Sequence, residues 1–216
     1  MTKIGGYDTL LCSFGKVNER KMKTPGNFSA PISARWAQQL GDLAQFEQQI
    51  NQLAQAMSLN LHDYPIDHLA LRANCDQTAK NWLTVLLNYG RILSDNIVNG
   101  RVIYLIELNE PLAFAGQLID VIELPFPKKT YPIESWEHIE IVMPFLPNES
   151  VVDWQMRIDN RFLWKKQAQL SIKLSEPKAA GEQLPNPSIA VSFADKRENP
   201  VCIKVHPYSI KKILEV

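Results

Sequence analysis

The 216-residue sequence lacks a net charge, because 23 basic side chains balance 23 acidic ones. A chain without a global positive field is not drawn to nucleic acid or to an anionic membrane surface, so we expect neither as a partner. Cysteine is scarce as well, since Cys12, Cys75 and Cys202 are odd in number, far apart and outside any Cys-x-x-Cys spacing. This pattern argues against a disulfide framework and a thiolate zinc site, and it favours free thiols in a reducing cytoplasm.

Long hydrophobic runs are also missing. No apolar stretch approaches the roughly 18 residues that cross a bilayer, and Leu10-Leu11-Cys12 is too short for the core of a signal peptide, so we expect a cytoplasmic protein. With 45% hydrophobic and 21% charged residues, the chain can bury a core as one domain or two small ones. Residues 1–33 are rich in Gly, Ser, Asn, Pro and Lys without periodicity, which predicts a flexible arm.

The stretch 34–60 predicts an N-terminal helix. Its apolar residues recur at steps of three and four, while glutamines fill the other faces: Trp36, Leu40, Leu43, Phe46, Ile50, Leu53 and Met57. A stripe of this kind either packs on the body of the fold or forms a dimer seam, and the two have the same spacing. We favour packing, and both a monomer and a homodimer stay open.

One strand pattern occurs twice, as Ile66-Asp67-His68-Leu69-Ala70-Leu71 and as Trp136-Glu137-His138-Ile139-Glu140-Ile141. In both copies an acid precedes a histidine, and aliphatic residues then occupy every second position, which is the period of a strand with one buried face. Each copy leads to a helix pattern, further strand patterns and a closing strand with one more potential metal ligand. We therefore interpret the chain as an internal duplication, with two halves that fold face to face around a shared polar centre.

The two predicted modules, 61–130 and 131–216, have the same order of strand, helix, strand, strand and strand, which is an α+β fold. In the first, Asp76 can cap the helix, Gly90 can end it, and Asn99-Gly100 is a strong hairpin signal. The second has a helix that begins near Asn148 or Ser150. The predicted strands cover 66–72, 92–98, 102–108 and 118–124 in the first module, and 138–143, 170–174, 188–193 and 201–205 in the second.

Strand alternation predicts which polar side chains share the concave face. That set consists of three imidazoles and two carboxylates: His68, Glu123, His138, Glu140 and His206. Three imidazoles with one carboxylate suit a divalent transition metal such as zinc, iron, nickel, cobalt or manganese, whereas calcium would want more oxygen ligands. Ligands on strand walls leave positions for water or substrate, which is the layout of a catalytic metal.

Each of these residues also has a plainer interpretation. A single strand histidine is more often a hydrogen-bonded core residue, and Glu123, before Pro125, can simply be solvated. Glu140 could act as a general base or as a partner of an imidazole, or it could be an exposed strand residue. Arg72 and Lys204 could bind a substrate carboxylate or phosphate, although single charges are commonly solvated.

Several short motifs, in order, resemble the YecM-like proteins of gamma-proteobacteria. They are Asp67-His68-Leu69-Ala70-Leu71-Arg72, Asn99-Gly100-Arg101, Ile122-Glu123-Leu124-Pro125, Trp136-Glu137-His138-Ile139-Glu140-Ile141-Val142, Leu184-Pro185-Asn186-Pro187 and Lys204-Val205-His206-Pro207. That family looks like a branch of the vicinal oxygen chelate superfamily, which includes glyoxalases and extradiol dioxygenases. The resemblance implies two βαβββ modules in a half-open mixed β-barrel with helices outside, and metal ligands at His68, Glu123, His138 and His206.

The last of these positions is usually a glutamate where glyoxalase or dioxygenase chemistry is known. It is His206 here, so the resemblance transfers neither reaction. We expect a divalent-metal-binding protein that supports lyase, isomerase or oxygenase chemistry on a small oxygen-bearing substrate. One alternative is a protein that binds a small molecule or metal without turnover, and another is a structural partner that uses the stripe from Trp36 to Met57.

Overall fold

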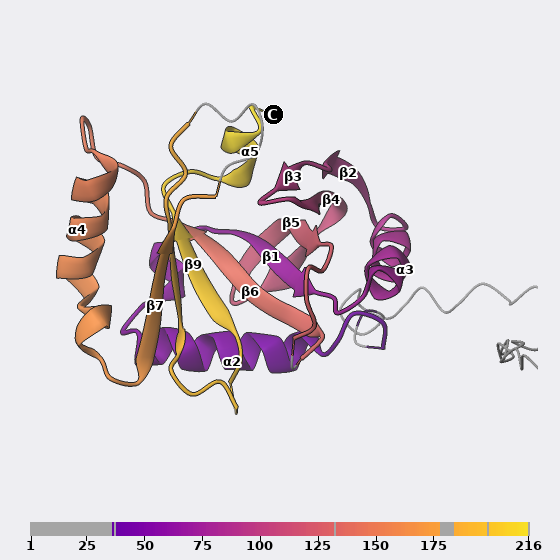
Figure 1. Cartoon of the computed structure of the whole chain (residues 1–216), viewed down its shortest axis with the longest axis horizontal. Coiled ribbons are helices and arrows are strands. Elements are labelled where there is room, and N and C mark those ends of the chain that lie inside the picture. The colour runs from indigo at the N-terminus through magenta and orange to yellow at the C-terminus, as the bar shows by residue number, and fades with distance from the viewer. Residues whose placement is uncertain (1–35, 37, 132, 178–183, 198, 216) are drawn as a thin grey trace, which may run out of the picture. The chain divides into compact units, whose positions relative to one another are not determined.

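A computed structural model describes residues 36, 38–131, 133–177, 184–197 and 199–215 (Figure 1), so the predicted arm 1–33 lies outside the described residues. This part of the chain forms a mixed α+β fold. The helices are α2 (Leu43–Ala56), α3 (Asp76–Leu86), α4 (Val151–Phe162) and α5 (Ile210–Ile213), with short 3₁₀ turns at Leu61–Asp63 and Trp164–Lys166. The strands are β1 (Ile66–Arg72), β2 (Gly90–Ser94), β3 (Ile97–Val98), β4 (Arg101–Phe114), β5 (Gln117–Pro125), β6 (Ser135–Val142), β7 (Leu170–Ser175), β8 (Ser188–Phe193) and β9 (Cys202–His206).

The strands form one nine-stranded mixed sheet in the order β2-β4-β5-β1-β6-β9-β8-β7, with β3 paired to β4. The two strands that carry the repeated pattern, β1 and β6, lie antiparallel at its centre, and each has a parallel neighbour on its other side, β5 and β9 respectively. The expected mixed sheet with helices is confirmed. Since β2 and β7 lie at opposite ends of the strand order, the sheet is not closed into a barrel.

The apolar face of the central strands makes the core. Leu69 and Leu71 of β1 and Ile139 and Ile141 of β6 are completely buried, as their alternation predicts. Helix α2 runs across β6 and β9 (Figure 1), and its buried stripe packs against this face. The other face of β1 and β6 is therefore left for the polar side chains of the same strands.

The N-terminal helix is shorter than its apolar spacing predicts. Among the described residues, α2 begins at Leu43 rather than near residue 34, because Gly41 has a φ of +106° and Asp42 caps the helix. The Asp42 carboxylate accepts hydrogen bonds from the backbone N–H groups of Ala44 and Gln45 at 3.0 Å. Trp36 still belongs to the buried core, so the apolar stripe is continuous although the helix is not.

Helix α3 begins and ends differently from the prediction. Its cap is Cys75, whose backbone is extended, and Asp76 is already helical. Gly90 does not stop the helix; it begins β2, where an added Cβ would lie 2.2 Å from the carbonyl oxygen of Glu107. The glycine is thus required by a close approach of two strands. The Asn99-Gly100 turn is confirmed, with positive φ at both residues between β3 and β4.

Helix α4 is fixed at its start and along its length. Ser150 caps it in a reciprocal pair with Asp153, so of the two predicted starts, near Asn148 or Ser150, the helix takes the second. Trp154 is fully buried, and its indole N–H donates to the carbonyl of Met143, just after β6, at 2.7 Å. Among the described helices, none is both long and apolar enough to cross a membrane.

Candidate metal centre

Five buried polar side chains meet on the polar face of the central strands. The register explains the meeting: Ala70 of β1 pairs with Glu123 of β5 on one side and with His138 of β6 on the other, and His68 pairs with Glu140. Because paired residues point to the same face, the four longer side chains surround the small Ala70 methyl group.

His206 reaches the same group from β9. It pairs with Val142 at the end of β6, and Lys204, two residues earlier on the same strand, pairs with Glu140. Its Nε2 lies 3.0 Å from a Glu140 oxygen. All five residues, His206 included, are more than nine-tenths buried. The site is therefore built from four adjacent strands at the sheet centre, and strands position side chains more precisely than loops do.

The distances suit a single metal ion. His68 Nε2 lies 3.5 Å from one oxygen of Glu123 and 3.5 Å from one of Glu140. His138 Nε2 lies 3.8 Å from Glu123 Oε1 and 3.4 Å from Glu140 Oε1. One ligand atom from each of these four residues lies within 4.8 Å of the others. A tetrahedral ion with bonds of about 2.1 Å would separate its ligand atoms by about 3.4 Å, which is close to the observed spacing.

Buried nitrogen atoms without hydrogen bonds give a second, independent test of this fit. The Nε2 atoms of His68, His138 and His206 are buried and have no hydrogen-bond partner among the described residues. A buried polar atom without a hydrogen bond costs about 1–3 kcal/mol, so these three atoms require an explanation. A cation would engage the lone pairs of His68 and His138, which form one group in coordination reach with Glu123 and Glu140, whereas His206 lies beside that group with its Nε2 3.0 Å from Glu140.

Two of the imidazoles are oriented by a hydrogen bond at Nδ1, the ring nitrogen that faces away from the cluster. His68 Nδ1 donates to Asp67 at 2.9 Å, and His206 Nδ1 donates to the side-chain oxygen of Asn186 at 2.9 Å. With the proton of the neutral ring held on Nδ1, the Nε2 lone pair faces the centre, which is how metal-binding histidines are usually supported. His138 has no such partner, since its Nδ1 is 3.6 Å from Glu137 without a hydrogen bond.

The electrostatics of the cluster keep its carboxylates ionised. Burial by itself raises the pKa of Glu123, but the charge of Lys204 and the imidazoles outweigh it and lower that pKa to about 2. Burial also raises the pKa of Glu140, yet His206, Lys204 and His68 bring it well below its usual value. These anionic oxygens are the ligand form that a divalent ion needs.

The two best-placed imidazoles differ in charge. Burial lowers the pKa of His68, but the carboxylates of Glu140, Asp67 and Glu123 outweigh it and raise that pKa well above 6.5. For His138, burial and the Lys204 charge lower the pKa to about 4. At neutral pH and without metal, His138 is therefore ready to coordinate, whereas His68 must first release a proton.

Residues 35–216 match the family described as YecM protein. This chain belongs to the YecM family. It is 36% identical over 174 residues to Protein YecM of Escherichia coli strain K12, a match that covers 80% of this chain and 89% of that relative. It is 66% identical over 174 residues to an uncharacterized protein of Haemophilus influenzae strain Rd, covering 80% of this chain and 90% of the relative.

A solved structure shares the fold of this YecM-family chain. The structural genomics protein EC4020 superposes with a TM-score of 0.69 at 31% sequence identity, over 90% of this chain and 98% of that one. Since nearly the whole of each chain is covered, the arrangement of sheet and helices is a property of one common fold. The likeness by itself says nothing of chemistry at the buried cluster.

The predicted substrate-binding residues of this YecM-family protein both have acidic partners. Arg72 forms an ion pair with Glu137, and its guanidinium lies 4.3 Å from the centre of the Tyr131 ring. Lys204 Nζ lies 2.9 Å from Glu140 Oε1. Both residues line one pocket of about 530 Å³ together with Glu123, His138, Glu140 and His206. The structure thus brings all seven predicted site residues to one place: six line the pocket, and His68 is fully buried beside Glu123 and Glu140.

Two residues of the site were not predicted. Asp67 supports His68, and the only sequence signal for it is the acid-before-histidine pattern that both copies share. Asn186 supports His206 from the loop before β8, 20 residues earlier in the chain. No local periodicity could find Asn186, because a loop residue reaches its partner through the tertiary fold alone.

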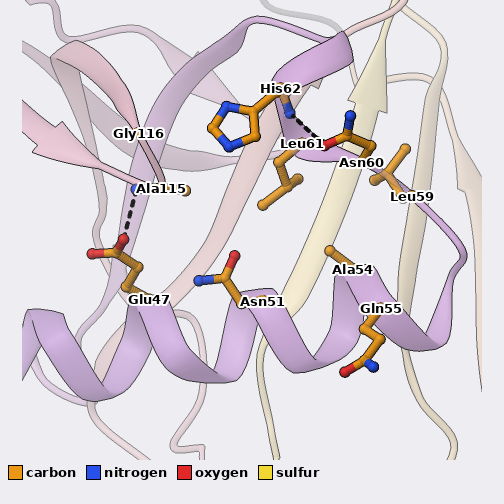
Figure 2. A pocket seen from close by; sticks show the side chains of 10 residues that line it. All are labelled: Glu47, Asn51, Ala54, Gln55, Leu59, Asn60, Leu61, His62, Ala115 and Gly116. Atoms are coloured by element: carbon orange, nitrogen blue, oxygen red, sulfur yellow. Dashed lines mark hydrogen bonds between the residues drawn. The ribbon is translucent and has the colours of Figure 1, made fainter.

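A second hollow of about 470 Å³ lies between α2 and the turn from β4 to β5 (Figure 2). Glu47 of α2 accepts a hydrogen bond from the backbone N–H of Ala115 at 2.9 Å, and the exposed His62 lies against Gly116. Within the described ranges, only the pocket of about 530 Å³ contains three or more metal-ligating side chains in coordination reach. The YecM-family site is therefore best sought in the first pocket.

Proposed function

We propose that this YecM-family protein binds a divalent transition metal through His68, Glu123, His138 and His206, with Glu140 beside it as the catalytic base. The proposal places the chain in the vicinal oxygen chelate superfamily, with βαβββ modules at 61–130 and 131–216. The sheet order supports it, because the first and last strands of each half, β1 with β5 and β6 with β9, are the parallel central pairs that carry these residues.

The observation that carries the proposal is the set of three buried imidazole nitrogens without hydrogen-bond partners beside two ionised carboxylates. Nitrogen ligands with carboxylate favour zinc, iron, nickel, cobalt or manganese over calcium and magnesium. The bound metal would supply Lewis-acid polarisation of a substrate oxygen. The pocket of about 530 Å³ has the size of a small-molecule site, so a small oxygen-bearing substrate fits the proposed centre.

Glu140 is the residue best placed to move a proton. Its Oε1 is held by Lys204 at 2.9 Å, while its Oε2 lies toward His68 and His206 at 3.5 and 3.0 Å. The charges of His206 and Lys204 keep the pKa of Glu140 low, so the carboxylate is ionised, which is the form that can accept a proton from a group next to the bound oxygen. Proton transfer of this kind is common to lyase and isomerase reactions.

One observation favours a second function, the retention of a metal or small molecule without turnover. Lys204 and the imidazoles surround Glu140, so the base is already engaged in ion pairs. A protein that only sequesters its ligand needs the same cluster but no free base. Turnover therefore decides between the two functions, whereas metal content tests the centre itself.

The experiment compares two single substitutions in protein purified without chelator. We expect near-stoichiometric metal in the wild type and in His62→Ala, because His62 is exposed and lies outside the cluster. His68→Ala should lose most of the metal, since it removes one ligand of the buried group. A wild type that stays metal-free after exposure to zinc, iron, nickel, cobalt and manganese, or equal metal in both variants, refutes the proposal.

Turnover is then tested with a panel of 2-oxoaldehydes, catechols and hydroxy acids. Chelator-sensitive consumption of any member, reduced in Glu140→Gln with the metal still bound, supports the enzyme. Stoichiometric metal without consumption of the panel supports the binding protein.

A further inference from the structure

The pocket above the candidate metal centre carries an excess of positive charge. Among the side chains that line it, three are acidic, Glu123, Glu137 and Glu140, and six are basic, Arg72, Arg101, Lys129, Lys173, Lys196 and Lys204. The chain as a whole has no net charge, so this excess is a local property of the pocket. Concave sites of one sign concentrate ions of the opposite sign.

The three acids are already engaged at the base of the pocket. Glu137 pairs with Arg72, and Glu140 pairs with Lys204. Glu123 lies against the imidazoles of His68 and His138 at 3.5 and 3.8 Å. The two basic residues that sequence reasoning assigned to a substrate are therefore occupied by acids of the protein itself.

Of the four remaining cations, Lys129 lies over the Tyr131 ring at 5.3 Å from its centre, and the other three come from separate segments. Arg101 begins β4, Lys173 lies on β7, and Lys196 lies in the connection from β8 to β9. In the part of the chain that the structure describes, none of these three forms an ion pair with a carboxylate. Lys173 and Lys196 are exposed, and Arg101 is half-buried. Like charges that share one concavity repel one another, which an anion between them would relieve.

Neutral donors line the same pocket. Ser171 and Ser175 of β7 and Ser192 of β8 face this pocket, as does Asn96 from the opposite side of the sheet order. Hydroxyl and amide donors beside lysine and arginine form the usual environment of a phosphate or carboxylate group. The cavity of about 530 Å³ is large enough to hold such a group and the metal-directed end of one small molecule.

We propose that the ligand of this pocket is a small anion whose phosphate or carboxylate group is held by Arg101, Lys173 and Lys196. The proposal rests on the proposed function, because the other end of the same molecule would present its oxygen atoms to the metal centre. It adds the substrate class and assigns recognition to Arg101, Lys173 and Lys196, the rim residues, rather than to Arg72 and Lys204. Selection for a charged ligand also explains why the cations converge from three segments.

The test uses the full chain after treatment with a chelator, so that no metal can bind the probe. Inorganic phosphate and malonate are titrated by calorimetry at low salt, with malonamide as the neutral analogue of malonate. The double variant Lys173→Gln and Lys196→Gln removes two rim charges. Its matched control, Lys80→Gln and Lys166→Gln, removes two exposed charges that do not line the pocket.

We expect both anions to bind at millimolar concentration while malonamide does not, and the rim double variant to weaken anion binding about tenfold. The control should stay within about twofold of the wild type, because long-range charge is screened. Arg101→Gln should weaken binding about fivefold. Equal weakening in both double variants, or no binding of either anion to the wild type, overturns the proposal.

Failure of this inference and failure of the metal proposal give different results. Metal content of the rim double variant should equal that of the wild type, since neither lysine belongs to the buried cluster. His68→Ala should bind phosphate within a few-fold of the chelator-treated wild type while it loses its metal. A rim variant that loses metal and anion together would show that the rim lysines act through the fold and not as an anion site.

Discussion

Replacement of Asp67 by alanine tests whether the imidazole geometry is built for a metal. The Asp67 carboxylate accepts two hydrogen bonds at 2.9 Å, one from His68 Nδ1 and one from the backbone N–H of Ile210 at the start of α5. Asp67→Ala removes both without touching a proposed ligand. His68 then loses the partner that orients its ring, and the C-terminal turn loses one attachment.

The expected magnitude follows from these two contacts. Loss of the group that orients a metal-binding histidine weakens metal affinity about 10–100-fold, equivalent to about 1.4–2.7 kcal/mol. At a metal concentration of about 100 times the wild-type Kd, stabilisation by the metal should fall from about 2.7 to about 0.4–1.4 kcal/mol. Without metal, the free energy of unfolding of the variant should be about 1 kcal/mol lower than that of the metal-free wild type, because the Ile210 N–H loses its acceptor.

The assay is calorimetric titration with zinc together with denaturant unfolding, with and without the metal. Asp120→Ala is the matched control, because Asp120 also attaches α5, through Lys211 Nζ at 2.7 Å, but touches no histidine. It should leave zinc affinity within about threefold of the wild type. If Asp67→Ala and Asp120→Ala bind zinc equally well, Asp67 does not orient a metal ligand, and the reasoning is refuted.

Two further predictions concern pH and the core. Because the raised pKa of His68 keeps its ring protonated near neutrality, metal binding must displace that proton, so affinity should rise about tenfold per pH unit until the pH passes that pKa. Calorimetry from pH 6 to 8 measures this, and a flat profile would contradict it. Trp154→Ala removes a fully buried ring and its bond to Met143, which should cost about 3–5 kcal/mol in denaturant unfolding. The exposed Val152→Ala on the same helix should cost less than about 0.5 kcal/mol, and equal losses would show that α4 is not anchored through Trp154.

Sequence periodicity found most elements but not their ends. The first strand, 66–72, has the bounds that alternation predicts. Strand β4 continues to Phe114 instead of 108, because a bulge between Glu107 and Leu112 shifts the register and breaks the alternation. Helix α2 starts late because the left-handed backbone at Gly41 interrupts a stripe that is otherwise regular. Local geometry of this kind is invisible to a count of apolar spacing.

The candidate site was predicted in the same uneven way. Alternation placed His68, His138 and Glu140 on the polar face of their strands, and all three are buried there. Alternation could not give the distances between side chains on different strands. It therefore did not show that Glu140, predicted as a base or a partner of an imidazole, lies within coordination reach of both histidines. Asn186 was missed for the same reason, since its bond to His206 spans two separate segments.

The sequence by itself determined the α+β class, the central strands and which of their side chains face away from the core, because those features follow from backbone periods that act within a few residues. The tertiary structure alone decided that the imidazoles converge with Glu123 and Glu140, that Arg72 and Lys204 pair with acids, and that other cations remain at the rim. The physical reason is register. Which residues become neighbours across strands depends on how distant segments are paired in the sheet, and no local pattern encodes that pairing.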